Sequence, residues 1–148
     1  VAPAGEPFEI LFVDNDVTRI GALSDDSRSF DLRVAGPAAL IVAKVHKIVE
    51  RVDTRRSRDK DALDIYRLLR SFEPSELGLR FAGLRAATVS AEPTSAALAE
   101  FTSLFGSSGA TGTDMVVRAT SGLEPEEEVR RSTVALAQDL IAVVGRST

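Results

Sequence analysis

The stretch that decides the fold is residues 38–51, AALIVAKVHKIVER, followed by residues 60–69, KDALDIYRLL. In the first segment apolar side chains recur every three or four residues, which predicts a helix that opens at Gly36-Pro37 and ends near Asp53. The same spacing in the second segment predicts a helix over residues 58–71. A short basic connector joins the two, so we expect an antiparallel helical hairpin.

Ahead of this helix pair, three short runs have the composition or alternation of β-strands: residues 8–13, 17–23 and 30–34. The tripeptide Asp14-Asn15-Asp16 after the first run is typical of a turn. We therefore expect about three antiparallel strands in residues 1–35.

After the helix pair, Pro74, Pro93 and Pro125 each follow a glutamate and each predict the start of a helix. The segment 113–120 is ambiguous, with a helix slightly favoured, and Gly145 is expected just past the last helix. The predicted fold class is α+β: one domain over residues 1–148, whose small sheet packs on a bundle of five or six helices in residues 36–148. The three proline-led helices are predicted over residues 75–87, 94–105 and 126–144.

The composition of the chain excludes several classes of function. A chain of 148 residues with a formal net charge of −4 is not expected to be a general nucleic-acid binder, so any anion site must be local. It contains no cysteine, which excludes a thiolate nucleophile and a cysteine-ligated zinc site. No apolar run reaches the length of a membrane span, and residues 1–7 do not look like a signal peptide. A cytoplasmic protein without a membrane partner is the expectation.

Charged side chains gather on the two deciding helices. Lys44, Lys47 and Arg51 share one side of the first helix, whereas Asp61 lies inside the apolar arc of the second and Asp64 at its edge. A carboxylate on a buried face needs a partner. Closing the hairpin about its connector brings Lys47 opposite Asp64 and Arg51 opposite Asp61. Charge pattern alone therefore favours two interhelical ion pairs.

Residues 38–51 and 60–69 also resemble the AbiEii/AbiGii-type nucleotidyltransferase-like toxins. Those proteins carry a helix of the form A-x-K-x-x-A/K-(x)-x-x-R and then a helix that opens (R/K)-D-x-x-D-(I/L)-Y-x-L. Elsewhere the chain agrees with the family in layout only, and the resemblance implies that the expected sheet in residues 1–35 is the remnant of a larger nucleotidyltransferase sheet. The resemblance implies a bacterial protein of the toxin-antitoxin or phage-defence type, in which magnesium assists transfer of a nucleotidyl group from a nucleoside triphosphate (NTP) to an RNA or protein hydroxyl.

The resemblance also implies roles for individual residues. Lys44 matches the family lysine thought to meet nucleotide phosphates, and Asp61 matches the first aspartate of the second motif, so Asp61 would orient Lys44 or a metal-bound group. Arg51 and Asp64 match supporting positions. The expected catalytic residues are thus Lys44, Asp61 and Asp64, and the expected nucleotide-binding residues are Lys44, Lys47 and Arg51.

The chain departs from the family pattern in one respect. The Gly-Ser-x(n)-Asp-x-Asp motif that holds magnesium in the family is not found before Lys44, so the resemblance is to the carboxy-terminal part, expected to be inactive alone. Asp14-Asn15-Asp16 has the spacing but no Gly-Ser before it. Gly106-Ser107 with Asp114 stands in the wrong order, and Val116 replaces the second aspartate. We predict no metal ligand in this chain.

Two rivals remain open: a non-catalytic helical module that contacts an antitoxin, a tRNA or a partner chain through the basic stripe, and a degenerate, inactive relative. Other candidate residues predict no chemistry. His46 is expected on a solvated helix face, and one histidine offers no metal cluster. Tyr66 is expected at the edge of the core, and Ser107 and Ser108 have no nearby base.

Overall fold

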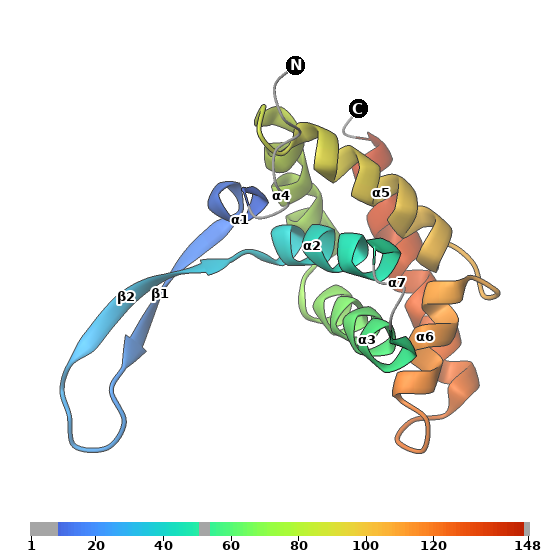
Figure 1. The fold of residues 1–148 in the computed structure, drawn as a ribbon, viewed down its shortest axis with the longest axis horizontal. Helices are drawn as coiled ribbons and strands as arrows, with labels where there is room; N and C mark the ends of the chain where they lie inside the picture. Colours follow the sequence, from blue (N-terminus) through green and yellow to red (C-terminus); the bar gives the residue numbers. More distant parts are fainter. Residues whose placement is uncertain (1–8, 51–53, 147–148) are drawn as a thin grey trace.

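A computed structural model describes residues 9–50 and 54–146. The fold is α+β, as predicted, and within the described residues it comprises one two-stranded antiparallel sheet and seven helices (Figure 1). None of the helices in these ranges is long and apolar enough to cross a membrane. In chain order the elements are α1 (Ile10–Val13), β1 (Asn15–Gly21), β2 (Ser29–Ala35), α2 (Pro37–Glu50), α3 (Arg55–Ser71), α4 (Pro74–Ala86), α5 (Ala91–Phe105), α6 (Thr111–Ala119) and α7 (Glu126–Arg146).

The helices share one hydrophobic core, and α2 lies at its centre. It packs against α3, α4 and α5, while α7 closes the opposite side by packing on α4 and α6 (Figure 1). The periodic apolar positions of the sequence are the buried ones, because burying one stripe of each helix removes it from water. Every helix contributes at least one fully buried side chain, for example Ile10, Ile41, Ile65, Phe81, Phe101, Val116 and Leu140.

Three predicted helix boundaries were wrong by a few residues. α3 begins at Arg55, so most of the expected connector is helical, with the amide of Arg58 bonded to the carbonyl of Thr54. α5 begins at Ala91 because a proline is tolerated in the first helical turn. α7 continues through the expected stop at Gly145. The ambiguous segment near residue 113 is helical, as favoured.

The first predicted strand was wrong, and the sheet has two strands instead of three. Residues Ile10–Val13 form the single helical turn α1, closed by the bond from the amide of Asp14 to the carbonyl of Ile10; Phe8 lies outside the described residues. The turn places Ile10 in the core and leaves Phe12 exposed. Tertiary packing of Ile10 thus overrides the strand preference of this run.

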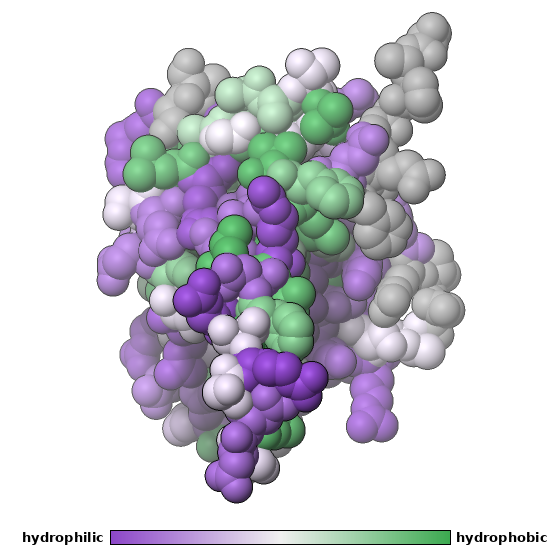
Figure 2. All heavy atoms as spheres, turned by 90° about the vertical axis from the view of Figure 1, so that its left-hand side faces the viewer, coloured by the Kyte–Doolittle hydropathy of each residue, from purple (hydrophilic) through white to green (hydrophobic). Residues whose placement is uncertain are grey.

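The other two predicted strands pair as a hairpin that extends away from the helices (Figure 1). Cross-strand partners point to the same face, so Ile20 with Phe30 and Thr18 with Leu32 form an apolar face. The side chains of Ile20, Phe30 and Leu32 are exposed, and the sheet stands off from the bundle instead of covering it. Figure 2 shows hydrophobic and hydrophilic side chains interleaved on the side of the molecule that carries the hairpin.

Asp14 fastens the hairpin to the bundle. Its Oδ2 accepts a hydrogen bond of 2.8 Å from the amide of Ala39 in the first turn of α2, and its Oδ1 contacts Arg80 of α4 at 2.8 Å. The carboxylate therefore caps α2 from a distant part of the sequence. Gly36 leaves the space for this contact, because a Cβ there would lie 2.2 Å from Asp14 Oδ1.

Candidate functional site

The charged cluster predicted between the two central helices exists, with Lys44 at its centre. Lys44 projects from α2 toward α3, where its Nζ lies 3.2 Å from Asp61 Oδ1 and 2.7 Å from Asp64 Oδ2. Asp61 and Asp64 stand one turn apart on α3, so both face the same ammonium. All three expected catalytic residues therefore meet at one point.

The cluster is half-buried, and its electrostatics follow from that. The Lys44 side chain is 20% exposed and the Asp61 side chain 9%. Burial acts to lower the pKa of Lys44, but the hydrogen bonds to Asp64 and Asp61 outweigh it, and the pKa is raised above its ordinary value. Lys44 is therefore a stable cation held between two carboxylates.

The expected nucleotide-binding residues are Lys44, Lys47 and Arg51, of which the structure describes the first two. Lys47 is exposed, and its predicted partner Asp64 instead contacts Lys44 and, at 3.6 Å, Arg67. The prediction that Lys47 lies opposite Asp64 was therefore wrong. Arg51 lies outside the described residues, together with its expected contact to Asp61.

His46 and Tyr66 both take structural positions. The expectation of a solvated His46 was wrong: the side chain is partly buried, and its Nε2 lies 3.0 Å from the carbonyl of Pro93 in α5. Tyr66 is 3% exposed, and its hydroxyl lies 3.3 Å from Ser132 of α7, which confirms the core-edge prediction. Both residues join helices.

The two segments that partly match the magnesium motif, at Asp14 and at Asp114, have structural roles. Both carboxylate oxygens of Asp14 accept hydrogen bonds, one from the amide of Ala39 and one from Arg80, which leaves Asp14 unsuited to magnesium. Asp114 pairs with Arg130 of α7 at 2.7 Å. Within residues 9–50 and 54–146, no three or more histidine or acidic side chains are grouped as a metal site would require. Asp14 and Asp114 therefore both have structural partners.

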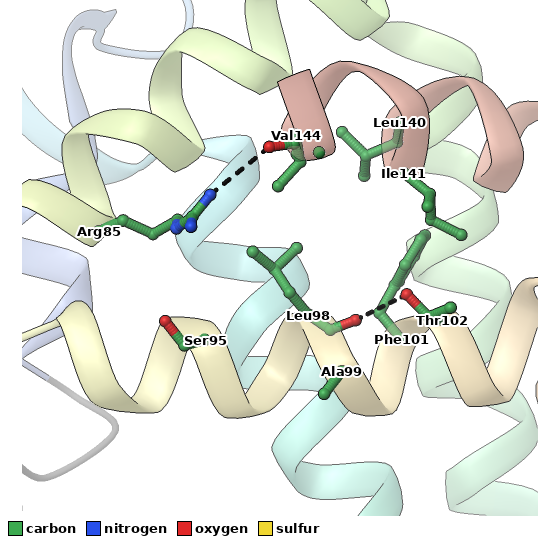
Figure 3. Close-up of a pocket in the computed structure, with 10 residues that line it drawn as sticks. Arg85, Ser95, Leu98, Ala99, Phe101, Thr102, Leu140, Ile141 and Val144 are labelled. Atoms are coloured by element: carbon green, nitrogen blue, oxygen red, sulfur yellow. Dashed lines mark hydrogen bonds between the residues drawn. The ribbon is translucent and has the colours of Figure 1, made fainter. Parts of the chain in front are cut away.

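One hollow of about 290 Å³ lies between α4, α5 and α7 (Figure 3). Lys44, Asp61 and Asp64 do not line it. Most of its lining side chains are apolar, such as Leu98, Phe101 and Leu140. Its polar groups are already engaged: Thr102 donates to the carbonyl of Leu98, and Arg85 reaches the carbonyl of Val144 (Figure 3). We interpret this hollow as an imperfectly filled space between helices, because none of its lining groups suits catalysis.

A second charged region was missed by sequence reasoning. The start of α3 and the neighbouring α6 enclose a hollow of about 640 Å³ lined by Arg55, Arg56, Lys60 and Arg118. Arg118 forms a two-point contact with Asp59, at 2.6 and 3.0 Å. The sequence RRSRDK at residues 55–60 carried the signal, but the prediction divided it between the connector and the start of the next helix.

Comparison of the chain with family models, with curated proteins and with solved structures finds no match.

Proposed function

We propose that this chain is the helical part of a nucleotidyltransferase-like protein in which Lys44 contacts the phosphates of an NTP. The observation that carries the proposal is the convergence of Lys44, Asp61 and Asp64 across α2 and α3, at the positions that the family motifs supply. Transfer to an RNA or protein acceptor is part of the proposal, as are the toxin-antitoxin context and a cytoplasmic location.

The geometry suggests how a phosphate would use this cluster. The ammonium of Lys44 is closest to Asp64, whose side chain is 25% exposed, and farther from the more buried Asp61. An incoming phosphate would displace Asp64, because that carboxylate can return to water at the lower cost. Asp61 would remain and hold Lys44 in place. No step is assigned to magnesium, because no group of three or more candidate metal ligands is found in residues 9–50 and 54–146.

A specific observation also favours a non-catalytic binding module. Lys44 already has carboxylate partners on α3, which is what a static interhelical ion pair requires. In addition, one face of the hairpin exposes Ile20, Phe30 and Leu32, and exposed apolar patches are common at protein interfaces. In this second candidate function, the chain contacts an antitoxin or another protein.

Calorimetric titration with ATP, GTP, CTP and UTP, with and without magnesium, separates the two functions. If Lys44 binds phosphate, Lys44→Met should weaken binding at least about tenfold, whereas Lys47→Met, which alters an exposed lysine of the same helix, should change it little. Asp64→Asn should strengthen binding several-fold because it removes the competing charge.

A static ion pair predicts a different pattern. Neither ATP nor the other three nucleotides would then bind saturably, or binding would be the same in the wild type, Lys44→Met and Asp64→Asn. Circular dichroism on each variant at the titration temperature shows that it is folded. The gain on Asp64→Asn is the decisive readout, because a structural role for Lys44 gives no reason for tighter nucleotide binding.

A further inference from the structure

We propose that the hollow between the start of α3 and α6 is a binding surface for single-stranded nucleic acid. This surface, the α3–α6 groove, comprises that hollow and a second one that shares Arg55, Asp59 and Arg118 with it. Together they are lined by Arg55, Arg56, Ser57, Arg58, Asp59, Lys60, Leu63, Met115, Arg118 and Ala119. The inference does not depend on nucleotide binding at Lys44, which does not line the groove.

The charge of the α3–α6 groove is opposite to that of the whole chain. Five basic side chains and a single carboxylate line it: Arg55, Arg56, Arg58, Lys60 and Arg118, with Asp59. The chain as a whole has a formal net charge of −4. A concave surface of one sign attracts ligands of the other sign, because the low-dielectric walls focus its field.

The basic residues at the beginning of α3 occupy positions where a positive charge destabilises a helix. Arg55, Arg56 and Arg58 occupy the beginning of a helix of 17 residues, which has no acidic residue in its first turn. The helix dipole puts a partial positive charge at this end, so cations there are repelled. Thr54 forms no side-chain cap. Stability of the helix does not explain this arrangement, whereas an anionic ligand does.

Not all the basic groups are balanced within the fold. Asp59 is engaged with Arg118, and that contact raises the pKa of Arg118. Arg55, Arg56 and Lys60 are exposed on the rim. Nε of Arg58 is buried, and no acceptor for it is found among the described residues. The groove therefore offers several cations to phosphate groups.

The chemistry of the groove favours nucleic acid over an acidic protein. Four of its five cations are arginines, whose planar guanidinium groups bind phosphate through two hydrogen bonds and also stack on bases. Leu63, Met115 and Ala119 add an apolar surface on which a base can lie. An acidic peptide would satisfy the charges but would leave this surface without a counterpart.

The test is fluorescence anisotropy of the whole chain with a labelled single-stranded RNA of about 12 nucleotides, without NTP. Arg55→Glu/Arg56→Glu reverses two exposed cations of the groove. Arg131→Glu/Arg146→Glu makes the same change in net charge at two exposed residues of α7 and is the matched control. Unlabelled pyrophosphate and polyglutamate serve as competitors, and Lys44→Met shows whether the nucleotide site is involved.

We expect saturable binding that weakens with salt, with a log–log slope of about −2 to −3 for three or four phosphate contacts. The groove variant should lose at least about tenfold in affinity, while the α7 control and Lys44→Met stay within about twofold of the wild type. Pyrophosphate should compete only weakly, because it offers fewer phosphates and no base.

Several results would overturn the proposal. These are the absence of saturable RNA binding at low salt, an equal loss in both double variants, or full affinity in the groove variant. Competition by polyglutamate as strong as that by unlabelled RNA would assign the groove to an acidic protein instead. Competition by pyrophosphate as strong as that by RNA would reduce it to a site for small phosphates.

Discussion

Lys44 on α2 and Asp64 on α3 are joined by a contact of 2.7 Å between Nζ and Oδ2, and the same ammonium lies 3.2 Å from Asp61. One cation thus holds together two carboxylates that would otherwise repel each other on a partly buried face. This relationship links the two central helices and has consequences for stability as well as for ligand binding.

Replacing Lys44 by methionine should lower the free energy of unfolding by about 1–3 kcal/mol, between the values for exposed and for buried ion pairs, because Asp61 and Asp64 then face each other without a cation. The matched Lys47→Met variant should change it by less than about 0.5 kcal/mol. Urea unfolding measures both. Equal small effects would mean that the cluster contributes nothing to the fold.

The stability that Lys44 contributes should depend on pH in one direction. Its pKa is raised above the ordinary lysine value in the folded chain, so the contribution is fully present below the unfolded pKa of about 10.4 and is lost as pH rises through the folded pKa. The difference in urea midpoint between wild type and Lys44→Met should therefore be flat from about pH 7 to 10 and shrink above about pH 10.5. A difference that grows over this alkaline range would contradict the assignment.

Gly36→Ala should destabilise the chain by about 2 kcal/mol or more, because the new Cβ would force Asp14 away from the first turn of α2. In an Asp14→Gly background the same change should cost much less, which a double-mutant cycle measures. Gly83→Ala is the control: a Cβ there meets nothing within 4 Å, and alanine in a helix should stabilise by up to about 1 kcal/mol.

Arg55→Glu/Arg56→Glu should raise the free energy of unfolding by about 0.3–1 kcal/mol per site, because acidic side chains suit the start of a helix. Thermal unfolding at low salt checks this. A higher melting temperature together with loss of RNA binding would show that the two arginines serve a ligand. A lower melting temperature would instead give them a structural role.

Much of the fold was predictable because helical periodicity is a local property. The apolar spacing that surrounds Ile41 and Ile65 located the two central helices. The turn at α1 was not predictable, since Ile10 is drawn into the core and Asp14 to the amide of Ala39 only when distant parts of the chain meet. Short apolar runs suit strands and buried helical turns equally.

The sequence predicted which residues lie in the charged cluster, but not which of them pair. The apolar arc of α3 correctly placed Asp61 on a buried face. The predicted partner of Asp64, Lys47, lies one helical turn away from the observed partner on α2. The reason is that α3 begins at Arg55 and not at the predicted Arg58. In an antiparallel helix pair, residues at equal distances from the connection face each other. An earlier start of α3 therefore moves the partner of Asp64 from Lys47 to Lys44.

The most direct test of the central claim is calorimetric titration of the wild type, Lys44→Met and Asp64→Asn with the four NTPs. Phosphate binding at Lys44 predicts saturable binding to the wild type, a loss of at least about tenfold in Lys44→Met and a several-fold gain in Asp64→Asn. An absence of saturable binding, or equal affinity in all three proteins, would contradict it and leave Lys44 as a structural cation between α2 and α3.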